Sequence, residues 1–270
     1  MSLVLDQTYE GVDADLFVPD GHDPGEAGRT VLGRIAMIMD AFDDGDQVLT
    51  LMDLSQRVHL PKSTVHRLAE QLRVLGWLER DYNGYRVGMR LFELGCLALQ
   101  PNQLRDIAFP HLSALAAKTG CAVQLGILDH GQVVYLERVL VGGYGLPTRL
   151  GGRMPAYCTA LGKAMLAYDG QAADEVMASK LERRTANTIT DPELLRSNLA
   201  QVRQSGVAFD VKEACEGLGC VAAPIRNSGR AIGAVSVTGP VTRMEWESTA
   251  EAVKNTAVSI WNARFGAPRS

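Results

Sequence analysis

The sequence lacks the features that carry a chain into or across a membrane. No uninterrupted apolar run reaches the roughly 20 residues that span a bilayer. No basic segment followed by an apolar stretch opens the chain, so we expect no signal peptide and predict a cytoplasmic protein. Because 46% of the residues are hydrophobic and 21% charged, the chain has an ordinary globular composition that can bury sizeable cores.

Cysteines are few and irregularly spaced. The five thiols are odd in number, which argues against a disulfide framework. Cys215 and Cys220 lack the paired C-x2-C spacing of a zinc site and no histidine follows them, so we expect no metal and no other cofactor. A nucleophilic Cys158 or Cys220 would need a base, and the second half offers only His111 and His130. We therefore do not expect an enzyme.

Positive charge is also scarce over the whole chain. Lys and Arg number 27 against 31 Asp and Glu, and the net charge of -4 by itself argues against a nucleic-acid partner. The distribution is uneven, however. Residues 1–28 contain no Lys or Arg, which predicts an acidic, disordered tail. From Arg57 to Arg90, seven basic residues face three acidic ones, and because salt confines each charge to about 10 Å, this local patch can attract a polyanion.

The N-terminal half has the pattern of a winged helix-turn-helix domain. Apolar residues at helical spacing predict three helices, of which Pro61 opens the third at a position where its missing N–H costs nothing. Asn83-Gly84 is a strong signal for a hairpin turn, so a two-stranded wing follows. We assign residues 29–90 to this domain. The expected elements are helices over residues 30–42, 51–58 and 61–75 and strands over residues 77–80 and 85–87.

The third helix carries the side chains that would read DNA. In a helix-turn-helix, the early residues of the second motif helix face base edges. Hydroxyls at Ser63 and Thr64 suit phosphate or base contacts, and Arg67 can reach guanine or a phosphate. The alternative is that this polar face of the helix is only solvated. For His66, and for Tyr82 at the tip of the wing, DNA contact and solvation both stay open. The candidate DNA contacts are Lys62, Ser63, Thr64, His66, Arg67, Arg73, Arg80 and Arg86.

Beyond Gly120 the pattern changes to strands interspersed with helices. It predicts an antiparallel sheet with helices on its faces, an α+β sensor-like domain over residues 120–266. Residues 91–119 are expected to form linker helices, interrupted at Pro101-Asn102, that transmit changes between the two domains. The expected strands cover residues 122–128, 133–139, 207–211, 220–226 and 231–238, and the expected helices residues 89–99, 103–118, 159–168, 171–180, 191–204 and 243–263.

Several polar residues of this half could line a ligand cavity. The small residues from Tyr157 to Gly162 turn a loop into a helix, whose free N–H groups and positive dipole end suit a carboxylate. Thr159 adds a hydroxyl there or only caps the helix. Ser236 and Thr238 alternate onto one face of a strand that could line the same cavity.

Four other side chains of this half each have two possible roles. Asp210 accepts a bond from a ligand hydroxyl or only caps a turn, and Cys220 lines the cavity or is a small buried hydrophobe. Arg149 and Arg153 neutralise an acidic effector or are solvated loop residues.

Four segments resemble one known family. The stretch Leu60-Pro61-Lys62-Ser63-Thr64-Val65-His66-Arg67-Leu68 resembles the recognition-helix opening of the isocitrate lyase regulator (IclR) family of bacterial transcription regulators. Residues 154–164 are similar to its effector-loop signature, and residues 206–224 and 234–240 are similar to its second signature and the strand that follows. They occur in the expected order along the chain between Thr30 and Ala263.

The resemblance implies an α+β chain with an N-terminal winged helix-turn-helix domain and a C-terminal GAF-like effector-binding domain. It implies homodimers through the DNA-binding half, often paired on a double-stranded, pseudo-palindromic operator. Tyr157 stands where many members have His, and Ala160 where glyoxylate and pyruvate responders have Gly. The Pro-Ala-Tyr form is similar to members that control aromatic-acid and β-ketoadipate catabolism. The candidate effector contacts are Leu146, Tyr157, Thr159, Ala160, Asp210, Leu218, Cys220, Ser236 and Thr238.

We therefore predict a regulator whose DNA binding responds to a small organic acid, a carboxylate or aromatic acid. A purely architectural DNA-binding module is the main alternative, and it predicts no ligand-dependent change in DNA affinity.

Overall fold

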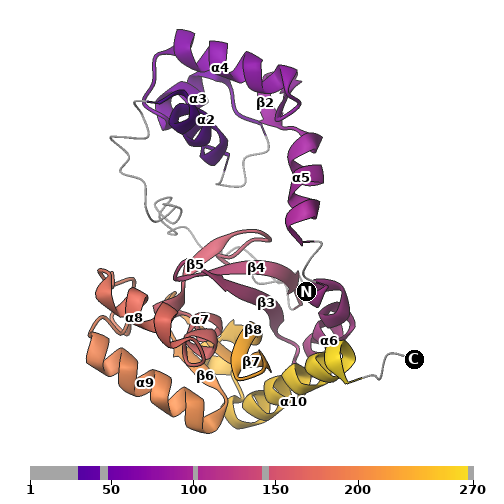
Figure 1. The fold of residues 1–270 in the computed structure, drawn as a ribbon, viewed down its shortest axis with the longest axis vertical. Coiled ribbons are helices and arrows are strands. Elements are labelled where there is room, and N and C mark those ends of the chain that lie inside the picture. The colour runs from indigo at the N-terminus through magenta and orange to yellow at the C-terminus, as the bar shows by residue number, and fades with distance from the viewer. Residues whose placement is uncertain (1–29, 43–47, 100–102, 142–145, 267–270) are drawn as a thin grey trace, which may run out of the picture. The chain divides into compact units, whose positions relative to one another are not determined.

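The computed structural model describes residues 30–42, 48–99, 103–141 and 146–266, which fall into two compact units (Figure 1). The first unit ends at Gln103 and the second begins at Leu104. The acidic tail predicted over residues 1–28 lies outside the described residues. Each unit is described by itself.

The N-terminal unit is a winged helix-turn-helix, as the sequence predicts. Apolar side chains of its three helices and its wing form one core, which includes Ile38, Leu54, Leu68 and Tyr85. Thr50 caps the second helix in a capping box with Asp53. The elements are α2 (Val31–Asp40), α3 (Leu51–Arg57), α4 (Lys62–Val74), the antiparallel hairpin of β1 (Leu78–Asp81) and β2 (Gly84–Val87), and α5 (Met89–Leu99).

The C-terminal unit is an antiparallel sheet with helices on both faces. Six strands lie in the order β5-β4-β3-β8-β7-β6. The strands are β3 (Ala122–Asp129), β4 (Gln132–Val139), β5 (Arg153–Pro155), β6 (Ala208–Val211), β7 (Leu218–Asn227) and β8 (Arg230–Pro240). The helices are α6 (Leu104–Thr119), η2 (Ala156–Cys158), α7 (Ala160–Leu166), α8 (Gly170–Ala178), α9 (Pro192–Ser205), η3 (Val241–Arg243) and α10 (Trp246–Phe265).

The helices divide between the two faces of this sheet (Figure 1). Helices α6 and α10 pack together on one face, against β3 and β7. Helix α7 packs on the other face, against β6, β7 and β8, with η2 beside it. We call the face under α7 the inner face. The short elements β5, η2 and η3 were not predicted, because three-residue segments carry no measurable periodicity.

Helix α7 packs so closely on η2 that Gly162 has no room for a side chain. A Cβ at Gly162 would lie 2.2 Å from the backbone oxygen of Ala156 and 2.3 Å from its Cα. We expect Gly162→Ala to lower the free energy of unfolding, measured in urea, by about 1–3 kcal/mol, because the backbone at Ala156 must move to make room for the Cβ. Gly170→Ala is the matched control, since a Cβ there meets nothing within 4 Å. A Gly162→Ala protein as stable as the control would contradict this packing.

Candidate functional site

The N-terminal half of α4 presents polar side chains to solvent. Its buried side consists of Val65, Leu68, Ala69 and Leu72, which pack into the core of the unit. The predicted DNA contacts Lys62, Ser63, His66 and Arg67 are exposed and Thr64 is half-buried. No described residue forms a hydrogen bond or ion pair with the charged groups of Lys62 and Arg67. This face therefore offers two cations with no intramolecular partner among the described residues.

The other three predicted arginines are held by carboxylates within the unit. Arg73 Nε donates to Glu70 Oε2 at 2.7 Å, and Arg80 Nη1 donates to Glu70 Oε1 at 3.2 Å. Arg86 Nη2 donates to Glu79 Oε2 at 2.8 Å. Their guanidinium charges are thus partly neutralised in the free protein, which the sequence alone did not show.

Glu70 joins the recognition helix to the wing. Besides the two arginines, its Oε1 accepts a hydrogen bond of 3.0 Å from the hydroxyl of Tyr85, a residue of the core on β2. Hydrogen bonds from Arg73 and Tyr85 hold the pKa of Glu70 below its usual value, so the carboxylate stays charged. The carboxylate fixes the wing against α4, the geometry that a winged helix needs to contact DNA with both elements.

A small cavity lies at the inner face of the C-terminal sheet. Its volume of about 40 Å³ would hold a few water molecules. Side chains from β3, β4, β6, β7 and β8 meet there with the segments that precede β5 and α7. The lining residues are Gln124, Tyr135, Leu146, Pro147, Thr148, Met154, Thr159, Leu161, Asp210, Ala214, Cys215, Leu218, Cys220 and Thr238.

Six of the nine predicted effector residues line this cavity: Leu146, Thr159, Asp210, Leu218, Cys220 and Thr238. The other three do not. Ser236 is fully buried on the same strand as Thr238, and Ala160 is buried at the start of α7. Tyr157 is buried in η2, where its hydroxyl donates a 2.6 Å hydrogen bond to the backbone oxygen of Glu182. Tyr157 therefore fastens a loop rather than facing the cavity.

A row of polar side chains crosses the cavity. The hydroxyl of Thr238 lies 3.2 Å from Gln124 Oε1 and 3.0 Å from Cys220 Sγ. Gln124 Nε2 donates to Thr148 Oγ1 at 2.6 Å. Gln124 and Thr148 were not predicted, because nothing in the sequence alone tells which face of β3 turns inward. The row gives the cavity hydroxyl and amide groups that can orient a polar ligand.

Thr159 caps α7, the second of its two predicted roles. Its Oγ1 accepts a hydrogen bond of 3.2 Å from the N–H of Gly162 and donates one of 3.2 Å to the backbone oxygen of Pro155. The hydroxyl thus has both a donor and an acceptor inside the protein. The start of α7 is consequently a weaker anion site than the sequence indicated.

Asp210 caps a turn while it lines the cavity. Its Oδ1 accepts hydrogen bonds from the N–H groups of Glu213 at 2.7 Å and Ala214 at 3.4 Å. Burial raises the pKa of this carboxyl to about 7, and the two backbone donors oppose the shift. Burial also raises the pKa of the Cys215 thiol to about 11 and that of Cys220 to about 12, so neither is an activated nucleophile.

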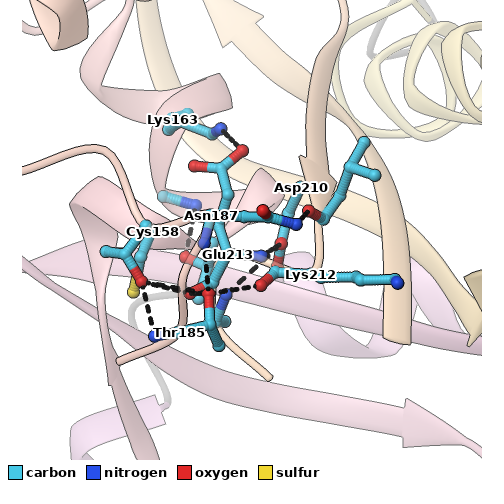
Figure 2. Close-up of polar contacts among 12 residues, drawn as sticks. Cys158, Lys163, Thr185, Asn187, Asp210, Lys212 and Glu213 are labelled. Carbon is cyan, nitrogen blue, oxygen red and sulfur yellow. Dashed lines mark hydrogen bonds and ion pairs between the residues drawn. The ribbon is translucent and has the colours of Figure 1, made fainter. Parts of the chain in front are cut away.

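A buried ion pair supports the segment that carries these residues. Figure 2 shows Lys163 of α7 pointing at Glu213, with Nζ 2.5 Å from Oε1. Lys163 is fully buried, and the backbone oxygen of Glu213 accepts hydrogen bonds from the hydroxyls of Thr188 at 2.7 Å and Thr185 at 3.2 Å. The pair therefore holds residues 210–215 of the cavity wall against α7. No pattern in the sequence predicts that Lys163 is fully buried.

The raised pKa of Asp210 predicts a pH-dependent stability. Between pH 4 and 7 the folded protein holds a proton that the unfolded chain releases, because the pKa rises from 3.8 to about 7 on folding. The free energy of unfolding should therefore fall as pH rises through this window. We expect Asp210→Asn to flatten that slope in urea titrations at pH 4.5, 6 and 7.5. Asp106→Asn, at an exposed position of α6, should keep the wild-type slope, and an unchanged slope in Asp210→Asn would contradict the shift.

The described residues contain neither a metal-binding cluster nor a membrane-spanning helix. No group of three or more His, Cys, Asp or Glu side chains in the described ranges could hold a metal ion. None of the helices in the part of the chain that the structure describes is both long and apolar enough to pass through a bilayer.

Comparison with known families gives two matches along the chain. Residues 31–82 match the IclR helix-turn-helix domain, and residues 96–261 match the C-terminal domain of the bacterial transcriptional regulator IclR.

Named relatives and solved structures cover most of the chain. The transcriptional regulator XynR of Escherichia coli is 34% identical over 78% of this chain and 86% of its own. The Pca regulon regulatory protein of Pseudomonas putida is 30% identical over 81% of this chain and 78% of its own. An IclR homolog from Microbacterium hydrocarbonoxydans, solved in complex with 4-hydroxybenzoate, is 32% identical, with a TM-score of 0.78 over 88% of this chain and 100% of its own.

Proposed function

The chain belongs to the IclR family of bacterial transcriptional regulators, and on that premise we propose that it binds a pseudo-palindromic DNA operator as a homodimer under the control of a small organic acid. Its helix-turn-helix domain is the DNA-binding part. The observation that carries the proposal is the pairing of this domain with a second unit whose inner face holds a polar-lined cavity.

The exposed face of α4 is the proposed base-reading surface. Lys62 and Arg67 have no carboxylate partner among the described residues, so no internal ion pair must break before they reach DNA. Arg73, Arg80 and Arg86 would exchange their glutamate partners for phosphates, which makes each contact weaker. The proposed contacts remain Lys62, Ser63, Thr64, His66, Arg67, Arg73, Arg80 and Arg86.

Helix α5 supports a dimer through the N-terminal unit. Met89, Phe92 and Leu97 on this helix are 63%, 67% and 57% exposed, and no side chain of α5 is fully buried among the described residues. Apolar helix faces of this kind are typical of protein interfaces. In a dimer of this kind, the two copies of α4 would lie one or more helical turns of DNA apart. The pairing of two dimers on one operator rests on the family resemblance alone.

The cavity is the proposed effector site. Six of the predicted effector residues line it, and a 32% identical homolog was solved in complex with 4-hydroxybenzoate, an aromatic acid. The named relatives are different regulators: XynR and KdgR of Escherichia coli are each 34% identical, and the Pca regulon regulatory protein is 30% identical. They therefore do not favour the aromatic-acid branch over the others. An architectural DNA-binding protein would have no use for a polar cavity in its second unit.

The test is a selection of random double-stranded DNA by the full-length protein, followed by titration of the selected site with and without candidate acids. We expect an inverted repeat to be enriched and at least one acid to change its affinity by about 5- to 150-fold, the usual range of allosteric coupling. Selection of no preferred sequence would overturn the operator proposal. A preferred sequence whose affinity no acid changes would favour the architectural alternative.

A further inference from the structure

The cavity lacks the cation that an acidic effector would need. Among the described residues that line it, none is Lys or Arg, and the one carboxyl group, that of Asp210, would repel an anion when ionised. Arg153, one of the two predicted counterions, pairs with Asp129 at 2.5 Å. Arg149 also has an interaction within the protein. Since Thr159 already caps α7, the carboxylate of an effector must find its partner elsewhere.

Strand pairing places one further arginine on the inner face. Arg138 of β4 lies directly opposite Gln124 of β3, and opposite residues of an antiparallel pair project to the same face. Gln124 lines the cavity, so Arg138 projects to the same side. Its neighbour Glu137 projects to the other side, where its carboxylate pairs with Arg105 of α6 at 2.9 Å. A register shift between Leu125 and Gly126 explains why Arg138 shares a face with Tyr135, three residues earlier.

The guanidinium of Arg138 is not satisfied within the described structure. Its Nε is buried and has no hydrogen-bond partner among the described residues. Burial lowers the pKa of Arg138, and the neighbouring Tyr135 opposes this shift. Glu137 Oε1 accepts a hydrogen bond from the backbone N–H of Arg138 at 2.9 Å, but no described carboxylate pairs with the guanidinium. Arg138 is half-buried, and a guanidinium with an unused donor is rare in such a position. Arginine side chains are normally buried only where a hydrogen-bond acceptor pairs with them.

We propose that Arg138 binds the carboxylate of the effector, with Gln124 and Thr148 beside it at the same end of the cavity. The inference rests on the proposed function, since it takes the cavity to be the effector site. Arginine suits this role because its fork of N–H groups binds a carboxylate through two parallel hydrogen bonds. The hydroxyls and thiol at the Thr238 end would then contact the remainder of the acid. The site therefore selects monocarboxylic acids over their neutral analogues.

The test compares acids with their amides on full-length protein. The probes are glycolate, benzoate and 4-hydroxybenzoate against glycolamide, benzamide and 4-hydroxybenzamide, measured by calorimetry and thermal shift. We expect the wild type to bind at least one acid about tenfold or more tightly than its amide. Arg138→Met should weaken binding of that acid by about 10- to 100-fold and leave the amide unchanged, the loss expected for a charged hydrogen-bonded pair. Arg138→Lys should restore part of the preference.

Arg230→Met is the matched control, because Arg230 is exposed at the turn between β7 and β8. A wild type that binds none of the acids, or an Arg138→Met protein that binds the acid within about twofold of wild type, would overturn the proposal. DNA binding by the wild type and by Arg230→Met without any acid tests the proposed function separately. Both proteins should bind the selected operator equally, and a wild type without sequence-specific DNA binding would count against the proposed function itself.

Discussion

Arg67→Ala is expected to lower the affinity for the operator by about 10- to 100-fold while the melting temperature stays unchanged. The guanidinium lies on the exposed face of α4 with no partner among the described residues, so its removal costs the folded protein nothing. A guanidinium that reaches guanine or a phosphate contributes about 1–3 kcal/mol to binding. Titration of a labelled operator at several salt concentrations measures the loss. If Arg67 contacts a phosphate, the slope of log K against log salt should also fall by about one.

Arg86→Ala is the matched comparison on the wing. Arg86 is also exposed, but it forms hydrogen bonds with Glu79 Oε2 at 2.8 and 3.1 Å, so its charge is already partly neutralised. We expect a smaller loss of DNA affinity from this variant than from Arg67→Ala. Equal losses of affinity would mean that the ion pair between Arg86 and Glu79 breaks at little free-energy cost when DNA binds. An unchanged affinity in Arg67→Ala would remove α4 from the proposed reading surface.

The arrangement of the N-terminal unit was largely predictable from local signals. The apolar spacing of α4 and the Asn83-Gly84 turn are each signals within a short stretch of sequence. Helix α4 and the hairpin both lie within one or two residues of the expected bounds. The neutralisation of Arg80 was not predictable, because Glu70 lies ten residues away and meets it only after the hairpin folds back on α4. The count of charges along the sequence therefore overestimates how many cations of this unit are unpaired and able to contact DNA.

The cavity shows the same division between local and long-range information. Asp210 and Thr238 were named from their local chemistry and from the family resemblance, whereas Gln124 and Tyr135 emerged only from the pairing of β3 with β8 and β4. A strand's inward face depends on its partner strands, and a single-residue slip reverses it. The register shift in β3 and β4, which places Arg138 on the inner face, has no counterpart in the sequence pattern.

Lys163→Met is expected to destabilise the C-terminal unit strongly. Lys163 is fully buried and its Nζ lies 2.5 Å from Glu213 Oε1. Its removal leaves the Glu213 carboxylate buried without its counterion, and Oε2 already has no hydrogen-bond partner among the described residues. Loss of one member of a buried pair costs about 3–5 kcal/mol. Urea unfolding at pH 7 measures the change, with Lys118→Met on the exposed side of α6 as control.

The second variant, Lys163→Met combined with Glu213→Gln, distinguishes charge from packing. If the uncompensated carboxylate causes the loss, the double variant should regain most of the stability, because no charge is left in the interior. A loss due to packing alone would persist in the double variant. Burial raises the pKa of Glu213, and without Lys163 the carboxyl should protonate at a still higher pH. The deficit of Lys163→Met should therefore shrink as the pH falls toward 5, whereas a deficit that is constant between pH 5 and 8 would contradict the electrostatic explanation.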